Sequence, residues 1–255
     1  MKALILAAGR GSRMQELTQE KPKCLVELHK KPLLLYQIEA LKNAGIDDIG
    51  IVVGYARECL ESYIKHFNLH SIINPQWADS NMIYSLYCAK EWLMDSDRVV
   101  VSYSDIFYSV AAIDSLLKSK DDIGILYSTQ WRKLWELRFD EPLLDAESFK
   151  QSDGVLREIG LKAQNLDEIQ GQYMGLLSFS LQGLRTLFSL SENLPKTTDS
   201  TTLLNTLLKN GQKIACVPYS GIWGECDNKD DLNLYESLFT PSDLETLTQK
   251  PTLKG

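Results

Sequence analysis

Two stretches near the start of the chain carry residues suited to phosphate chemistry. Gly9, Gly11 and Arg13 follow an opening run of apolar residues, and Lys23 comes ten positions later. A glycine-rich turn lets backbone N–H groups approach phosphate oxygens closely, because no Cβ atom intervenes. Arg13 can neutralise the β- and γ-phosphates of a nucleotide through bidentate contacts. Lys23 supplies a second cation within reach of an α-phosphate.

This turn matches neither of two familiar phosphate-binding motifs. No Gly-Lys-Ser or Gly-Lys-Thr sequence follows it, as a P-loop requires, and the third glycine of the dinucleotide fingerprint is absent. Taken alone, the glycines fit an ordinary strand-to-helix turn with solvated charges equally well. The assignment therefore needs support from other parts of the chain.

Two acidic residues are candidates for binding a divalent cation. Asp105 follows a hydrophobic segment, and Asp227 ends the sequence Trp223-Gly224-Glu225-Cys226-Asp227. Such carboxylates can hold Mg²⁺, which bridges triphosphate oxygens and offsets charge during an in-line displacement. Each residue also has a local alternative, Asp105 as a helix N-cap and Asp227 in a surface turn. If both bind the ion, they must meet across the sheet.

The elements that must position these residues alternate regularly. Apolar runs predict strands, and apolar residues at helical spacing predict helices. In the first hundred residues the predicted strands are 2–8, 49–53, 71–73 and 98–102, and the predicted helices are 33–44, 56–67 and 81–94. This order predicts an α/β fold with a Rossmann-like, mostly parallel sheet and helices on both faces. Ligands of such sheets bind at the carboxyl ends of the strands, where the glycine turn and Asp105 fall.

The pattern is looser beyond residue 105. Strands are predicted at 123–128, 155–160, 173–179 and 213–217, and helices at 111–118, 181–190, 200–209 and 229–239. Residues 131–153 show no clear period. With no linker or repeat visible, we expect one domain over 1–240, with a nucleotide-binding half (1–110) and an acceptor-binding half (111–240) that contains an inserted lobe. We expect 241–255 to be a loosely ordered tail.

Net charge, cysteine content and hydrophobic run length limit the kinds of partner and compartment that this chain fits. The formal net charge of −7 disfavours nucleic acid, which binds basic surfaces. Five cysteines without a C-x-x-C pair argue against a disulfide framework and a zinc site, and favour a reducing compartment such as the cytoplasm. The opening apolar run is too short to span a bilayer, and no later stretch is long enough. We therefore expect no membrane association.

Residues 2–13 read KALILAAGRGSR, and Lys21-Pro22-Lys23 follows. This combination resembles the signature of the nucleotidyltransferases that make nucleotide sugars and CDP-alcohols, strongly over the first 110 residues and weakly beyond. The resemblance implies a fold of the nucleotide-diphospho-sugar transferase type. It also implies transfer of a nucleoside monophosphate from a triphosphate to a phosphorylated acceptor, with Mg²⁺ as cofactor. The acceptor's own phosphate oxygen attacks, so catalysis depends on positioning and electrostatics.

The same resemblance implies roles for individual residues. Arg13 and Lys23 would bind phosphates and stabilise charge at the α-phosphorus, while Asp105 and Asp227 would chelate Mg²⁺. These four are the expected catalytic residues. The backbone around the first turn would hold the base and the phosphates, through Leu6, Ala7, Ala8, Gly9, Gly11 and Ser12.

Residues 79–86, DSNMIYSL, preceded by Asn74-Pro75 and followed by Tyr103-Ser104-Asp105, resemble the phosphocholine cytidylyltransferase group. That group includes enzymes acting on 2-aminoethylphosphonate and on phosphorylated amino-acid side chains. The resemblance implies CTP as the donor, Asn81 and Ser85 near the base, and Gly54 and Tyr55 near the ribose. Asn81 also fits a helix N-cap. Sugar nucleotidyltransferases more often carry Gly-x-Gly-Asp where this chain has a Ser-Tyr-Ser-Asp sequence.

The same resemblance implies six candidate residues for binding the acceptor. Aromatic faces attract ammonium groups and, with carboxylates, can form a cation cage. The aromatic candidates are Trp131, Trp135 and Tyr173, and Glu168 is the carboxylate candidate beside Glu136, Asp145 and Glu147. Arg138 and Lys162 are candidates for the acceptor phosphate. The two tryptophans, spaced i and i+4, fit core packing as well as a binding face.

We therefore expect a cytidylyltransferase that uses CTP, or another nucleoside triphosphate, and a small phosphorylated acceptor. Phosphocholine, 2-aminoethylphosphonate and a phosphorylated amino acid or amide are the acceptors considered. The alternatives are a sugar-1-phosphate nucleotidyltransferase and a nucleotide-sensing domain without activity. The intact pair of Asp105 and Asp227, together with Lys23, argues against a sensor. A monomer and a homodimer both remain open.

Overall fold

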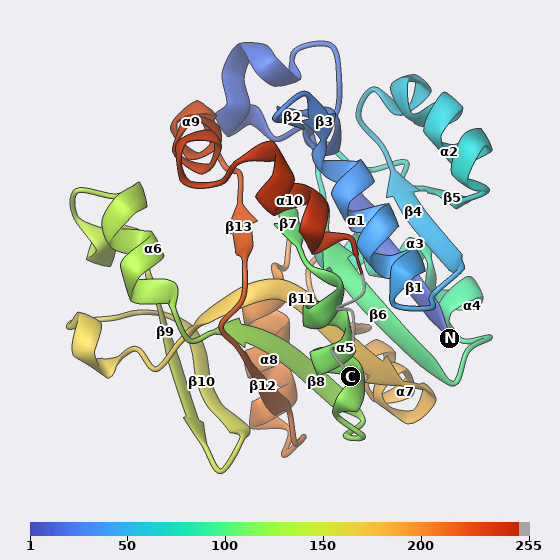
Figure 1. The fold of residues 1–255 in the computed structure, drawn as a ribbon. Helices are drawn as coiled ribbons and strands as arrows, with labels where there is room; N and C mark the ends of the chain where they lie inside the picture. The colour runs from blue at the N-terminus through green and yellow to red at the C-terminus, as the bar shows by residue number, and fades with distance from the viewer. Residues whose placement is uncertain (250–255) are drawn as a thin grey trace, which may run out of the picture.

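The computed structural model describes residues 1–249 and contains a central nine-stranded sheet (Figure 1). The strands of this sheet are β1 (Lys2–Ala7), β4 (Asp48–Val53), β5 (His70–Ile73), β6 (Arg98–Tyr103), β8 (Ile123–Ser128), β9 (Glu147–Ser152), β10 (Val155–Lys162), β11 (Gln172–Ser180) and β12 (Ala215–Tyr219). Their order is β5-β4-β1-β6-β11-β8-β12-β10-β9. Two small sheets pair β2 (Glu27–Leu28) with β3 (Lys31–Pro32) and β7 (Ile106–Tyr108) with β13 (Trp223–Glu225).

Helices cover both faces of the sheet (Figure 1). The α-helices are α1 (Leu33–Asn43), α2 (Glu61–Phe67), α3 (Met82–Cys88), α4 (Lys90–Leu93), α5 (Val110–Lys118), α6 (Trp131–Arg138), α7 (Leu181–Ser191), α8 (Ser200–Lys209), α9 (Lys229–Leu238) and α10 (Pro241–Leu247). Short 3₁₀ segments are η1 (Ser12–Thr18), η2 (Lys23–Leu25), η3 (Arg57–Leu60), η4 (Pro142–Leu144) and η5 (Leu166–Glu168). Within residues 1–249, no helix is long and apolar enough to cross a membrane.

The first half of the sheet is parallel, as the alternating pattern predicts. β1 pairs in parallel with β4 and β6, and β4 pairs in parallel with β5. All six residues of β1 are buried, because helices cover a parallel sheet on both faces. The expected Rossmann-like fold is confirmed. Its carboxyl strand ends bring the first glycine turn beside the end of β6.

The second half of the sheet is mixed. β11 runs antiparallel to both β6 and β8, and β9 and β10 form an antiparallel pair at the sheet edge. Figure 1 shows α6, β9 and β10 together, at the opposite end of the molecule from β4, β5 and α2. The stretch 131–153, which shows no clear period in the sequence, thus contains the helix α6, the 3₁₀ turn η4 and the whole edge strand β9.

The expectation of a loosely ordered tail is wrong for residues 241–247, which form α10. Thr240 and Asp243 cap this helix reciprocally. Leu244 and Leu247 are buried in a second apolar cluster beside Met14 and Tyr36. The remainder of that predicted tail includes 250–255, which lie outside the described residues. The helix forms because two apolar side chains one turn apart have a core to enter.

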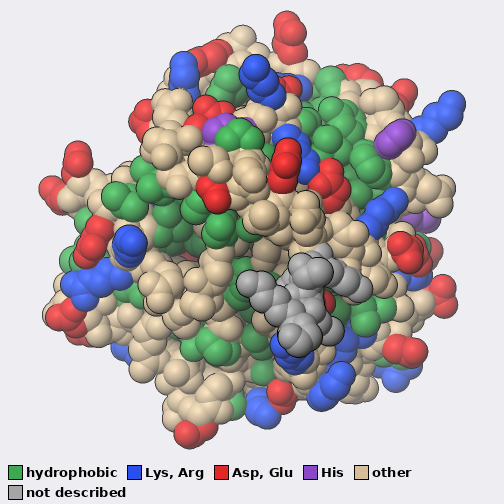
Figure 2. All heavy atoms as spheres, viewed as in Figure 1, with side chains coloured by type: hydrophobic (Ala, Val, Ile, Leu, Met, Phe, Trp, Pro, Cys, Tyr) green, Lys and Arg blue, Asp and Glu red, His purple; other side chains and the backbone are tan. Residues whose placement is uncertain are grey.

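Charged side chains are spread over the visible face of the molecule. Figure 2 shows Lys and Arg side chains interspersed with Asp and Glu side chains over the described residues on this face, with apolar atoms between them. On this face, neither sign of charge forms a broad patch over the described residues (Figure 2).

Candidate active site

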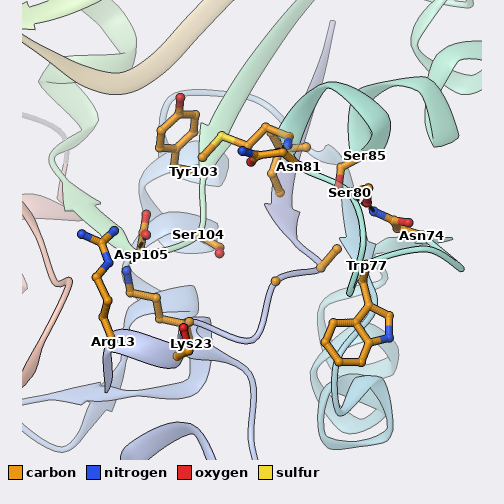
Figure 3. Close-up of a pocket in the computed structure, with 16 residues that line it drawn as sticks. Arg13, Lys23, Asn74, Trp77, Ser80, Asn81, Ser85, Tyr103, Ser104 and Asp105 are labelled. Atoms are coloured by element: carbon orange, nitrogen blue, oxygen red, sulfur yellow. Dashed lines mark hydrogen bonds and ion pairs between the residues drawn. The ribbon is translucent and has the colours of Figure 1, made fainter. Parts of the chain in front are cut away.

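A cavity of about 270 Å³ opens at the carboxyl ends of β1 and β6. Figure 3 shows Arg13, Lys23 and Asp105 gathered at one side of it, and Asn74, Trp77 and Ser85 at the other. Ten of the predicted site residues line it: Leu6, Ala8, Gly9, Gly11, Ser12, Arg13, Lys23, Asn81, Ser85 and Asp105. Ala7 is buried in the core, 2% exposed, and contributes no lining side chain.

Gly11 is required at its position for two reasons. Its φ is +70°, in the left-handed region that favours glycine. A Cβ atom there would also lie 2.7 Å from the Cβ of Lys23, so the lysine side chain packs directly over the turn. The glycine turn therefore sets the path of Lys23 as well as leaving backbone exposed to the cavity.

Lys23 joins the two predicted metal-binding acids. Its Nζ lies 2.7 Å from Oδ2 of Asp105 and 2.8 Å from Oδ1 of Asp227, and the lysine side chain is only 8% exposed. Burial alone would lower the pKa of Lys23, but the contacts with Asp105 and Asp227 raise it above its usual range overall. The ammonium group is therefore charged and compensates both carboxylates. Arg13, which is 67% exposed, contacts the same Asp227 oxygen at 2.7 Å.

The pairing of β7 with β13 brings these acids together although they are distant in sequence. Glu225 lies opposite Ile106 in that pair, and the backbone N–H of Cys226 donates to the carbonyl of Asp105 at 2.9 Å. One ligand oxygen from each of Asp105, Glu225 and Asp227 falls within 4.8 Å of the others. The requirement that Asp105 and Asp227 meet is thus fulfilled, and a third acid joins them.

Three features of this acid cluster fit a divalent cation. Oδ1 of Asp105 is buried and has no hydrogen-bond partner in the described residues. Burial raises the pKa of Glu225, and the negative charges of Asp227 and Asp105 raise it further, while the nearby Arg138 and Lys23 oppose this shift only in part. Carboxylate oxygens are the ligands that Mg²⁺ prefers. Sequence reasoning missed Glu225 as a ligand, although its i, i+2 spacing from Asp227 was a usable signal.

The far end of the cavity is built around Asn74. Its Nδ2 donates to the hydroxyls of Ser80 and Ser85, both at 3.1 Å, and its Oδ1 accepts from the backbone of Gln76 at 2.9 Å. Asn81 lines the cavity and also caps α3, since its Oδ1 accepts from the N–H of Met82 at 2.8 Å. Both sequence interpretations of Asn81 are therefore compatible with its position.

Trp77 is a cavity residue that sequence reasoning missed. A Cβ on Gly54 would lie 2.5 Å from the Cβ of Trp77, so this glycine permits the tryptophan to approach the end of β4. The ring of Tyr55 meets the Trp77 ring edge-on at a centroid distance of 5.1 Å. Gly54 and Tyr55 thus lie behind Trp77 and do not line the cavity. A lone aromatic in a loop gave no periodic signal for this role.

A second cavity of about 340 Å³ adjoins the first. The two share Arg13, Met82 and Tyr103 as lining residues, and the second also reaches Glu225 and Asp227. The acid cluster therefore lies at the boundary between two spaces, one on the side of the glycine turn and one on the side of the second half of the chain.

The second cavity combines aromatic rings with acidic side chains. Trp135 and Tyr173, two of the six acceptor candidates, line it together with Asp145, Glu147 and Asp199. The indole N–H of Trp135 donates to Asp145 at 3.0 Å. Burial is the main cause that raises the pKa of Asp145 and of Glu147. Asp199, the N-cap of α8, was missed because its sequence context indicates a helix start and nothing more.

Four of the six predicted acceptor residues lie elsewhere. Trp131 is 4% exposed and packs in the core. The Arg138 side chain is 0% exposed and is paired with Asp231, so it is not free to receive a phosphate. Lys162, at the end of β10, and Glu168, in η5, are exposed and line neither cavity. These four residues do not line the two cavities, because the connections of the second half decide which side chains face inward.

Two cytidylyltransferases are among the curated proteins similar in sequence to this chain. The chain is 36% identical over 249 residues to CTP:phosphoglutamine cytidylyltransferase of Campylobacter jejuni, covering 92% of this chain and 98% of that protein. It is 47% identical over 96 residues to choline-phosphate cytidylyltransferase of Streptococcus pneumoniae, covering 38% of this chain and 42% of that protein.

Two solved structures have the same fold. One is inositol-1-phosphate CTP transferase from T. maritima, with a TM-score of 0.77, 17% identity, and coverage of 97% of this chain and 95% of that one. The other is CTP:phosphocholine cytidylyltransferase from Streptococcus pneumoniae, with a TM-score of 0.69, 23% identity, and coverage of 93% and 98%. Residues 3–152 match the family model of the MobA-like NTP transferase domain. With this match and the extended identity above, the chain belongs to the MobA-like NTP transferase family.

Proposed function

We propose that the chain transfers CMP from CTP to a small phosphorylated acceptor and releases pyrophosphate. The observation that carries the proposal is the contact of Lys23 with both Asp105 and Asp227 at the boundary between two adjoining cavities. A nucleotide in the first cavity and an acceptor in the second would meet at this point. The similarity to cytidylyltransferases supports the same reaction.

The reaction needs no nucleophile from the protein. An acceptor phosphate oxygen attacks the α-phosphorus of CTP, a new P–O bond forms, and the bond to the β-phosphate oxygen breaks. Backbone N–H groups beside Gly11 and the side chain of Arg13 would hold the leaving phosphates. Lys23 would donate to the α-phosphate and stabilise the charge that builds there.

Mg²⁺ is part of this proposal. Asp105, Asp227 and Glu225 would hold the ion, since they supply three clustered carboxylates with one buried oxygen lacking a partner. When bound, the ion would neutralise phosphate charge and help to align the triphosphate. The ammonium group of Lys23 would then be released from its contacts with Asp105 and Asp227 and could bind the phosphates instead.

CTP is the proposed donor. The cavity end formed by Asn74, Ser80, Ser85 and Asn81 offers hydroxyl and amide groups that can hydrogen-bond the edge of a base. Such groups discriminate between bases well, because a mismatched base leaves a buried polar group unpaired. The cytidylyltransferase activity of the similar proteins supports cytosine as the base.

The second cavity supports an acceptor that carries a positively charged nitrogen. Asp145, Glu147 and Asp199 place three carboxylates near the aromatic rings of Trp135 and Tyr173. A cation among them would gain ion-pair and cation–π attraction. Its charge would also offset the energetic cost of burying the three carboxylates. Phosphoglutamine is the first candidate, because its amino-acid part bears an ammonium group and a similar enzyme is named for it. Phosphocholine and 2-aminoethylphosphonate follow.

A panel assay tests the proposal. The protein is incubated with each nucleoside triphosphate, Mg²⁺ and each acceptor, and pyrophosphate release is measured. Turnover with CTP and an amino-bearing phosphate is the expected result. Turnover with a sugar 1-phosphate instead would identify a sugar nucleotidyltransferase, and tight nucleotide binding without turnover would identify a sensor. Asp105→Ala is the control, expected to be inactive yet folded.

Two wider expectations belong to the same proposal. The reaction would take place in the cytoplasm, where CTP is available. One chain supplies every residue of the proposed site, so a monomer and a homodimer are both compatible with it.

A further inference from the structure

Arg138 and Asp231 form a buried ion pair beside the acid cluster. Arg138 ends α6 with its side chain 0% exposed, and the side chain of Asp231, in the first turn of α9, is 2% exposed. Nε and Nη2 of the arginine donate to the two carboxylate oxygens of Asp231 at 2.8 and 3.0 Å. A two-point contact of this kind fixes orientation as well as distance.

Asp231 in turn holds the backbone that carries Asp227. Oδ2 of Asp231 accepts from the N–H of Asp227 at 2.8 Å and from the N–H of Asn228 at 3.3 Å. Asn228 completes the cap, because its side chain accepts from the N–H of Asp231 at 2.9 Å. The direction of the Asp227 side chain therefore depends on Asp231, and the position of the Asp231 carboxylate depends on Arg138.

Arg138 also faces the acid cluster directly. Its Nη2 lies 3.7 Å from Oδ2 of Asp227, and its Nη1 lies 4.0 Å from Oε2 of Glu225. Nη1 is buried and has no hydrogen-bond partner within residues 1–249. The guanidinium carbon also lies 5.1 Å from the ring centroid of Trp135, which lines the second cavity. One buried cation thus lies beside two acids of the cluster and beside an aromatic ring of the second cavity.

We propose that Arg138 and Asp231 are positioning residues that orient Asp227 toward the divalent ion. This inference rests on the proposed function, since it concerns the ion held by Asp105, Glu225 and Asp227. Residues that orient metal ligands typically change metal affinity or activity by about 10- to 100-fold when they are mutated. Weakening the pair is therefore expected to raise the ion concentration that the protein needs.

The test compares Arg138→Lys and Asp231→Asn with the wild type. Arg138→Lys keeps the charge but loses the two-point contact, and Asp231→Asn keeps an oxygen acceptor but loses the ion pair. Arg132→Lys is the matched control, because Arg132 also lies on α6 and forms an exposed ion pair with Asp167 at 2.6 Å. Mn²⁺ binding to the nucleotide-free protein is followed by the electron paramagnetic resonance signal of the free ion. The Mg²⁺ dependence of pyrophosphate release is measured separately.

Both pair variants are expected to bind Mn²⁺ about 10- to 100-fold more weakly and to need correspondingly more Mg²⁺ for half-maximal turnover. Arg132→Lys is expected to match the wild type in both measurements. A folded Arg138→Lys protein with wild-type Mn²⁺ binding would overturn the inference and leave the proposed function intact, whether or not Asp231→Asn folds. A wild type that neither binds Mn²⁺ nor needs a divalent ion would overturn the proposed function itself.

Discussion

Replacing Lys23 by methionine removes the positive charge that contacts both Asp105 and Asp227. At the 2.7 Å separation from Asp105, two unit charges attract by about 6 kcal/mol if the effective dielectric constant is about 20. Desolvation of the buried groups offsets much of this attraction, and breaking a buried ion pair typically costs about 3–5 kcal/mol. In a protein of this size, that loss corresponds to a decrease in Tm of roughly 6–20 °C.

The same variant distinguishes charge compensation from simple packing. A divalent ion at the acid cluster would restore part of the lost compensation, so we expect Mg²⁺ to raise the Tm of Lys23→Met more than that of the wild type. Turnover should fall by about 100- to 1,000-fold and should not recover, because a donor to the α-phosphate is missing. Thermal melts with EDTA and with Mg²⁺, together with pyrophosphate release, measure both effects. A variant that melts like the wild type in EDTA would refute the reasoning.

Three further predictions concern other parts of the molecule. Gly54→Ala is expected to raise KM for CTP and to lower Tm, because the new Cβ would overlap Trp77. Unchanged steady-state kinetics would show that CTP binding does not depend on the position of Trp77. Asp145→Asn is expected to raise KM for the acceptor while KM for CTP stays constant, since it lines only the second cavity; an equal change in both constants would contradict that division. Leu244→Ala should cost about 2–5 kcal/mol in denaturant unfolding, because its side chain is fully buried; a cost near zero would mean that α10 does not pack as described.

The nucleotide side of the site could be predicted because its signals are local. Each signal occupies a few consecutive residues: a buried apolar strand, the glycine turn after it, and an acid at the end of a later strand. The rule that ligands bind at carboxyl strand ends then places Gly11 and Asp105 together. The structure confirms the parallel sheet and brings Lys23 to Asp105 and Asp227.

The acceptor side could not be predicted in the same way, because long-range pairing decides it. Arginine side chains usually lie at the protein surface. Arg138 is buried beside Asp231 because α6 packs against α9. Glu225 becomes a third acid of the cluster because β13 pairs with β7, a strand of three residues with no periodic signal. Charge and residue type alone gave no means of separating the buried Arg138 from the exposed Lys162.

The most direct test of the central claim locates the metal. Crystals grown with CTP and Mn²⁺ would be measured at the manganese absorption edge, where anomalous scattering identifies the ion. The account predicts an ion coordinated by Asp105 and Asp227, with the triphosphate beside Gly11 and Arg13. An ion bound elsewhere, or a triphosphate lying away from the first glycine turn, would contradict it.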